Sequence, residues 1–455
     1  MRRFFHAACV LAAIIAVPGV LAGQSIEIPT DPGPMARQVR QEFLYSWNAY
    51  KQFAWGHDEL KPLSRTPHDW YRTPLLMTPV DALDTMILMG LNDEADKTRQ
   101  LIDAKLSFDQ DIEVKNFEIT IRLLGGLLSS YQLTGDKRLL ELAEDLGNRL
   151  LPAFNSPTGM PYVYVNLKTG KTRDAVSNPA EIGTLLIEFG TLSKLTAKPI
   201  FYDKAKSAVT ELYGRRSKIG LVGSSINVET GQWVDTTSHI SGGIDSYYEY
   251  LLKSWLLFGD KDCEHMWKES IKAVNKYLAD DTKAGLWYAQ VDMNTGKRVS
   301  THFGALDAFF PAVLARSGEI QRARRLEDSA FKMWTTWGVE PEEIDYSTMK
   351  IVSPQYPLRP EIMESAYYLR FYTNDDRYTE MASTFLGALS HYCKTENGYA
   401  DIRNVTTFEK ADKMESYFLA ETLKYLYLTF APRSTLDLNK VVFNTEAHPI
   451  RKTWQ

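Results

Sequence analysis

The chain has 455 residues, with 52 Lys and Arg against 57 Asp and Glu and a formal charge of −5. The absence of a basic run excludes nucleic acid as the main partner. With 27 Gly and 20 Pro, the composition excludes collagen-like and disordered chains. Aromatic residues make up 12% of the chain, which fits a large core and also a cleft that stacks on flat ligand faces.

Residues 1–22 are typical of a secretory signal peptide. Arg2 and Arg3 precede an apolar run that closes on Val20, Leu21 and Ala22. An uncleaved anchor is the alternative, although the run is slightly short for a membrane span. We therefore expect an exported protein, periplasmic or secreted, with no membrane segment after cleavage and a single domain over residues 23–455. We also expect a monomer.

The three cysteines limit the number of disulfides that the chain can form. Cys9 leaves with the signal peptide, so that Cys263 and Cys393 remain. Two cysteines allow one disulfide in an oxidising compartment, and the sequence leaves open whether they pair. They are too few for a disulfide scaffold or a cysteine-based zinc site.

A turn between two helical patterns recurs along the chain at intervals of 43 to 62 residues. Gly or Asn suits the left-handed residue that ends a helix, and Asp or Lys then starts the next one. These intervals are mostly longer than those of known helical solenoids. The pattern therefore predicts an all-α closed ring of helical hairpins. The turns are marked by Asn92, Gly135, Ala197, Gly259, Gly318 and Asn374.

Seven nearly apolar helices are expected, each with an ionisable side chain near its start; six precede the turns and the last covers residues 412–421. Five of these side chains lie 13 to 17 residues before their turn marker, which is one helix length. A single carboxylate there is usually a helix cap. Repeated in phase around a ring, such groups would converge on one acidic pocket, suited to a polyhydroxylated neutral ligand and to acid–base chemistry. They are Glu118, Glu181, Asp245, His302 and Glu361.

Several strings in order along the chain resemble the class I α-mannosidases of glycoside hydrolase family 47. The resemblance runs from about Asp58 to Pro449. The matching strings are 57–62 (HDELKP), 117–127 (FEITIRLLGGL), 245–251 (DSYYEYL), 358–361 (LRPE), 413–416 (KMES) and 442–449 (VFNTEAHP).

The resemblance implies an (α/α)7 barrel as one catalytic domain. It implies calcium-dependent hydrolysis of terminal α-1,2-linked mannose, with inversion at the anomeric carbon. The expected partner is a mannose-containing oligosaccharide. The signal peptide without a long anchor favours a bacterial or fungal secreted member, and we take a bacterial one.

The family roles carry over one position at a time. Glu118 matches the general acid and Glu361 the general base, while Asp245 matches a carboxylate that is an alternative acid. Thr445 matches the residue that binds calcium through its carbonyl and hydroxyl oxygens. Residues that match substrate-binding or calcium-water positions are Arg122, Glu181, His302, Arg359, Glu364, Tyr417, Glu421 and Glu446.

Three positions depart from the family pattern. Ala305 replaces a cysteine that eukaryotic members bridge, so their usual disulfide is absent. Gly243 stands where an Arg often narrows the choice of mannose branch, which predicts a more open entrance. Tyr417 replaces a Phe that stacks on the sugar.

Two other functions are weighed against hydrolysis. A mannose-binding lectin on the same fold would need neither Glu118 nor Glu361. A lyase or epimerase on a ring of six hairpins would not explain seven acidic helices or Thr445.

Overall fold

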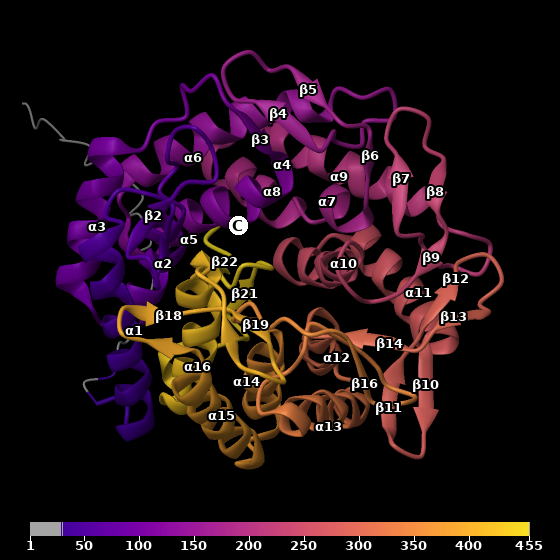
Figure 1. Cartoon of the computed structure of the whole chain (residues 1–455). Helices are drawn as coiled ribbons and strands as arrows, with labels where there is room; N and C mark the ends of the chain where they lie inside the picture. Colours follow the sequence, from indigo (N-terminus) through magenta and orange to yellow (C-terminus); the bar gives the residue numbers. More distant parts are fainter. Residues whose placement is uncertain (1–28, 30, 455) are drawn as a thin grey trace, which may run out of the picture.

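The computed structural model describes residue 29 and residues 31–454; the predicted signal peptide lies outside the described residues. Seven inner helical segments form a closed ring (Figure 1). The inner segments are α2 (Met77–Leu88), α4 (Asn116–Ile119) with η1 (Thr120–Leu124) and α5 (Gly125–Thr134), α7 (Pro179–Gly183) with α8 (Leu186–Thr196), α10 (Asp245–Phe258), η3 (Leu306–Phe309) with α12 (Phe310–Ser317), α14 (Glu361–Thr373), and η5 (Phe418–Thr422) with α16 (Leu423–Phe430).

An outer ring of helices surrounds the inner one. Each outer helix packs on the inner segment before it, and α1 packs on α16 at the point where α2 meets η5, so that the two ends of the chain close the ring. This arrangement confirms the predicted (α/α)7 barrel. The outer helices are α1 (Pro34–Phe53), α3 (Asn92–Lys105), α6 (Lys137–Leu150), α9 (Pro199–Gly214), α11 (Lys261–Tyr277), α13 (Ile320–Trp337) and α15 (Arg377–Ala388).

Hydrophobic patterning explains the two rings. In α2 every residue except Ile87 is buried, as expected for a helix covered on all sides. Helix α6 buries one stripe that includes Leu139, Leu142 and Leu146 and exposes charged residues on its other face. Cys263 and Cys393 are both buried and free, and no helix among the described residues is long and apolar enough to cross a membrane.

The hairpin turns follow the predicted pattern at five of six markers. Gly135, Ala197, Gly259, Gly318 and Asn374 all have positive φ and end an inner helix. The prediction for Asn92 was wrong. There the left-handed residue is Gly90, with φ 69°, and Asn92 already begins the outer helix α3.

The long segments that connect the hairpins fold into short antiparallel sheets, which the helical pattern does not predict. The strands, grouped by sheet, are β1 (Glu59–Lys61) and β2 (Thr66–His68); β3 (Glu113–Lys115), β4 (Tyr164–Asn166) and β5 (Thr172–Arg173); β6 (Val176–Ser177), β7 (Ser225–Asn227) and β8 (Trp233–Asp235); β9 (Thr237–Ser238), β12 (Gln290–Asp292) and β13 (Arg298–Ser300); β10 (Ala279–Thr282) and β11 (Gly285–Tyr288); β14 (His302–Gly304), β15 (Glu343–Asp345) and β16 (Lys350–Ser353); β17 (Lys394–Thr395) and β18 (Gly398–Tyr399); β19 (Ile402–Asn404) and β20 (Glu409–Lys410); and β21 (Val441–Phe443) and β22 (Pro449–Arg451).

The last hairpin, β21–β22, lies inside the ring (Figure 1). Hydrogen bonds connect its turn to several inner helices. The Asn444 amide donates to the Ile121 carbonyl and to Glu188, each at 2.8 Å. The Lys424 ammonium donates to the Ala447 carbonyl at 2.6 Å. The hairpin is therefore a plug that holds residues 444–448 in a fixed place within the barrel.

Two glycines of α5 make room for this plug. A Cβ at Gly125 would lie 2.5 Å from the Asn444 amide nitrogen, and one at Gly126 would lie 2.8 Å from Val80 and 3.1 Å from His448. Any side chain at either position would push the hairpin or α2 away. The Gly-Gly pair in the string 117–127 is thus required by close packing around the plug.

Candidate active site

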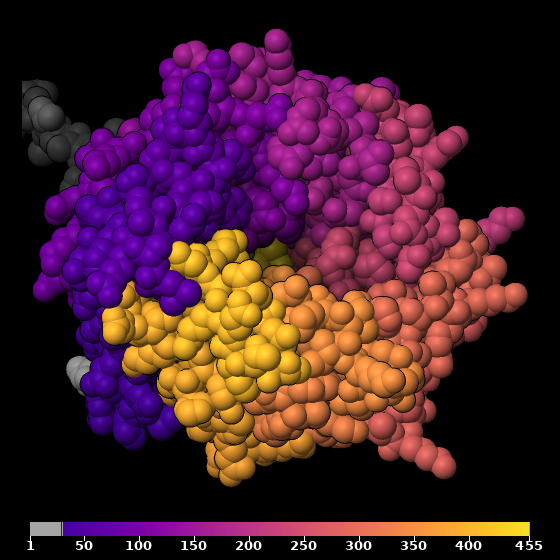
Figure 2. Space-filling model, in the orientation of Figure 1, coloured from indigo at the N-terminus to yellow at the C-terminus, as the bar shows by residue number. Residues whose placement is uncertain are grey.

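A pocket of about 280 Å³ opens at the centre of the ring, where Figure 2 shows a hollow in the surface. This volume lies near the lower end of the range for small-molecule sites. Inner segments from around the ring and the plug all contribute to its walls. Eleven of the twelve predicted site residues line it: Glu118, Arg122, Glu181, Asp245, Arg359, Glu361, Glu364, Tyr417, Glu421, Thr445 and Glu446.

His302 is the exception, because it does not line this pocket. The sequence pattern placed it at the start of an inner helix, but the structure puts it on strand β14, with Nδ1 3.3 Å from Glu343. The acid at the start of this inner segment is Asp307, which is buried and accepts the Gly304 N–H at 2.8 Å. Burial raises the pKa of Asp307 to about 7.

Glu118 and Arg122 form the ion pair that their spacing predicts, with Glu118 Oε2 3.1 Å from the Arg122 guanidinium. The same guanidinium also binds Glu446 and lies 3.6 Å from Asp81. Both residues come from a helix that contains a π-helical turn, Thr120–Leu124, and such turns are frequent at functional sites. Arg122 therefore fixes Glu118 at the pocket wall through a network from three separate parts of the chain.

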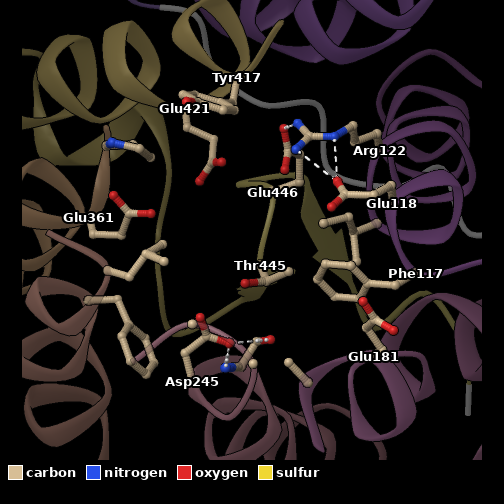
Figure 3. A pocket seen from close by; sticks show the side chains of 18 of the residues that line it. Phe117, Glu118, Arg122, Glu181, Asp245, Glu361, Tyr417, Glu421, Thr445 and Glu446 are labelled. Carbon is tan, nitrogen blue, oxygen red and sulfur yellow. Dashed lines mark hydrogen bonds and ion pairs between the residues drawn. The ribbon is translucent and has the colours of Figure 1, made fainter. Parts of the chain in front are cut away.

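Glu361 lies on the opposite side of the pocket from Glu118 (Figure 3). It is the first residue of α14, and burial raises its pKa to about 7, although Arg359 acts in the opposite direction. Arg359 is itself held by Glu342, with contacts of 2.6 and 3.1 Å. A carboxyl group with a pKa near neutrality can take up a proton at physiological pH, as a general base must.

Other carboxyl groups crowd the same cavity. Burial raises the pKa of Asp245, at the start of α10, to about 6. Burial also raises the pKa values of Glu364, Glu421 and Glu446, and neighbouring carboxylates add to this effect in each case. Such a concentration of acidic groups favours bound protons or a cation.

Thr445 lies near the centre of the pocket at the tip of the plug (Figure 3). Its backbone N–H donates to the Tyr250 hydroxyl at 3.2 Å. Within the described part of the chain, neither its carbonyl oxygen nor its hydroxyl takes part in a hydrogen bond. Among the described residues, these two Thr445 oxygens thus have no protein partner in a hydrogen bond.

Tyr417 supplies an aromatic wall. Its hydroxyl donates to the Pro357 carbonyl at 2.5 Å, which fixes the ring. The guanidinium carbons of Arg122 and Arg359 lie 5.6 and 6.0 Å from the ring centre. The Tyr417 ring therefore lies close to both arginines of the pocket.

Some lining residues were not predicted. Lys115 is the most notable, because its ammonium contacts Glu181 at 2.7 Å and lies 3.9 Å from Glu118. Only its closeness to Glu118 in the sequence could have drawn attention to it. Asn178, Phe117 and Phe309 also line the pocket.

Comparison with known proteins identifies the family. The sequence profile of glycosyl hydrolase family 47 matches residues 42–452. The chain belongs to glycosyl hydrolase family 47.

Curated relatives in this family align over most of their length. Alpha-mannosidase I MNS5 of Arabidopsis thaliana is 35% identical over 99% of this chain and 82% of its own. Mannosyl-oligosaccharide 1,2-alpha-mannosidase MNS1 of the same plant is 34% identical over 93% and 80%. ER degradation-enhancing alpha-mannosidase-like protein 2 of Homo sapiens is 36% identical over 92% and 78%.

A solved structure supports the same family. The alpha-1,2-mannosidase from Trichoderma reesei superimposes with a TM-score of 0.84 at 30% identity, over 92% of this chain and 98% of the other. Cellobiose 2-epimerase from Spirochaeta thermophila reaches a TM-score of 0.58 at 11% identity, which shows a shared fold alone. The family 47 assignment therefore removes the lyase or epimerase alternative.

The charges around Glu361 predict a pH effect. A base must be ionised, so kcat/KM is expected to rise with pH as Glu361 loses its proton. Because Arg359 lowers the pKa of Glu361, Arg359→Met should move the acidic limb of the pH profile to higher pH. Arg359→Lys keeps a positive charge and should leave the limb nearer to that of the unaltered enzyme. A limb that stays in place, or moves to lower pH, in Arg359→Met would contradict this role.

Proposed function

We propose that this family 47 member is an inverting exo-α-1,2-mannosidase that removes terminal α-1,2-linked mannose from oligosaccharides. The observation that carries the proposal is the placement of Glu118 and Glu361 on opposite sides of one pocket (Figure 3). An acid and a base facing each other across a sugar are what hydrolysis needs, whereas a lectin needs neither. The relatives named as 1,2-alpha-mannosidases support the choice of substrate.

In this proposal each carboxyl group has one task. Glu361 takes a proton from the attacking water, and Glu118 gives a proton to the leaving oxygen, directly or through a water. Arg122 orients Glu118 through contacts of 3.1 and 3.2 Å. Asp245 is the alternative proton donor, and burial raises its pKa to about 6, so it too can hold a proton.

The plug favours an exo mode of attack. Because the β21–β22 hairpin lies inside the ring with Thr445 in its turn, we expect that a sugar chain cannot pass through the ring (Figure 1). Only a chain end fits a pocket of about 280 Å³. The Tyr417 ring offers an apolar face to the terminal sugar, as aromatic side chains do in saccharide sites.

The donor set fits calcium. The two Thr445 oxygens without protein partners are hard ligands of the type calcium prefers, and the surrounding carboxylates can hold its water ligands. Among the described residues, no group of three or more His, Cys, Asp or Glu side chains could bind a metal directly. When bound, calcium would contact sugar hydroxyls and favour distortion of the ring towards the transition state.

Hydrolysis of α-1,2-mannobiose tests the proposal. The purified protein should release free mannose from the α-1,2-linked disaccharide and much less from the α-1,3- and α-1,6-linked isomers. Glycan arrays would separate the lectin alternative, since a lectin would bind mannosides with no release of mannose over the same period.

A further inference from the structure

One pocket cation has no task in the proposed reaction. Of the described residues that line the pocket, three are cationic: Lys115, Arg122 and Arg359. The two arginines are committed to protein carboxylates, Arg122 to Glu118 and Glu446 and Arg359 to Glu342. Lys115 is held at Glu181 by a contact of 2.7 Å, and its side chain is 32% exposed.

The ammonium of Lys115 keeps hydrogen-bonding capacity for a ligand. A lysine has three N–H donors, and the 2.7 Å contact with Glu181 uses one of them. The 3.9 Å distance to Glu118 is too long for a hydrogen bond. Burial works against its charge, but Glu181 and Glu118 raise the pKa of Lys115, so that it stays charged.

Glu181 is itself fixed, so that it can orient Lys115. Its second oxygen accepts the Ser177 hydroxyl at 3.2 Å, and its backbone N–H donates to Asn178 at 2.9 Å. Lys115 ends strand β3 and Glu181 lies in α7, so the ion pair joins two neighbouring segments of the ring.

This pair lies on a different wall from the residues assigned to the terminal sugar. Glu181 lies across the pocket from Glu361, Glu421 and Tyr417 (Figure 3). Gly243 lies beside this wall, since its carbonyl accepts the Ala180 N–H at 2.9 Å, and as a glycine it places no side chain into the pocket that it lines. A disaccharide whose terminal sugar sits at Thr445 has this side of the pocket available for its second sugar.

We propose that Lys115, oriented by Glu181, is a specificity-determining residue that donates a hydrogen bond to a hydroxyl of the sugar next to the cleaved bond. This inference rests on the proposed function and names the group that recognises the leaving sugar. It predicts that Lys115 contributes to the hydrolysis of substrates whose leaving group is a sugar. It should contribute little when the leaving group is not a sugar.

The test compares two substrates, α-1,2-mannobiose and α-mannosyl fluoride, whose leaving group has no hydroxyls. Lys115→Met should lower kcat/KM for mannobiose by about 10-fold or more, mainly through KM, because a hydrogen bond from a charged donor is lost. Its kcat/KM for the fluoride should stay within about twofold of the unaltered enzyme. Lys115→Arg should restore part of the mannobiose activity, and Glu181→Gln should reproduce the selective loss.

Lys168→Met is the matched control, because Lys168 is exposed on the turn that follows β4, outside the pocket. It should leave both substrates unaffected. Equal losses on both substrates in Lys115→Met, or no loss on either, would overturn the inference while the proposed function stands. If the unaltered protein hydrolysed neither substrate, the proposed function would fail, and the inference with it. Thermal melting of each variant confirms that it is folded.

Discussion

Glu361→Gln is expected to reduce kcat on α-1,2-mannobiose by about 10² or more, as is typical for loss of a general base. The amide has nearly the shape of the carboxyl group but cannot take the proton of the attacking water. Glu118→Gln should cause a loss of similar size on this substrate, because the leaving sugar oxygen needs a proton. Both variants should still bind the disaccharide in calorimetry, since Thr445 and Tyr417 are unchanged.

α-Mannosyl fluoride separates the two roles. Fluoride departs with little help from an acid, so a variant that lacks the acid should lose much less activity on this substrate than on mannobiose. A variant that lacks the base should lose activity on both. We expect Glu118→Gln to show the first behaviour and Glu361→Gln the second, and Asp245→Asn shows whether Asp245 shares the proton delivery.

Glu343→Gln provides the control for these variants, because Glu343 contacts His302 outside the pocket lining. It should keep close to full activity on both substrates. Near-native kcat in Glu361→Gln would remove this residue from the mechanism.

Removal of calcium is expected to abolish hydrolysis, and added calcium should restore it. Thr445→Ala should raise the calcium concentration needed for half-maximal activity by at least about 10-fold, since changes even beyond the direct ligands of a metal typically cost that much affinity. The alanine keeps the carbonyl ligand and removes the hydroxyl. Thr445→Ser keeps both oxygens and is the matched control, with calcium dependence close to that of the unaltered enzyme.

Direct calcium titration by calorimetry, without any substrate, should show similar calcium affinities for the unaltered enzyme and Thr445→Ser and a weaker affinity for Thr445→Ala. A full rate after treatment with a chelator would show that the assignment of Thr445 is wrong.

The ring of hairpins could be predicted from the sequence because helix periodicity and left-handed turn residues are local signals. Gly135 and Gly259 end helices wherever the rest of the fold lies. His302 was misplaced because an apolar run after an ionisable residue does not distinguish a buried strand from a helix. At Asn92 the nearby Gly90 took the left-handed position instead.

Four of the five ionisable side chains that repeat in phase line the pocket, as the helix pattern predicted, but the other site residues were predictable only from the resemblance. The i+4 spacing of Glu118 and Arg122 predicts their ion pair, but the contact of Arg122 with Glu446 joins residues more than three hundred positions apart. No sequence motif marks Thr445 as a calcium ligand. Its proposed role depends on its place in the plug, which is positioned by inner helices from around the ring. Lys115 was not predicted, because a lysine at the end of a strand usually lies on the surface. Only the structure shows that its ammonium contacts Glu181 in the pocket.

The stereochemistry of the first product tests the central claim most directly. An inverting enzyme needs room for a water between its base and the anomeric carbon, with its carboxyl groups roughly 6.5–9.5 Å apart instead of about 5–5.5 Å. Glu118 and Glu361 lie on opposite sides of the pocket, and from this placement we expect inversion (Figure 3). Proton NMR of α-1,2-mannobiose hydrolysis, recorded before mutarotation, should show β-mannose as the first product released from the non-reducing end. If α-mannose appeared first, the enzyme would be retaining, and the assignment of Glu361 as a base that activates water would be wrong.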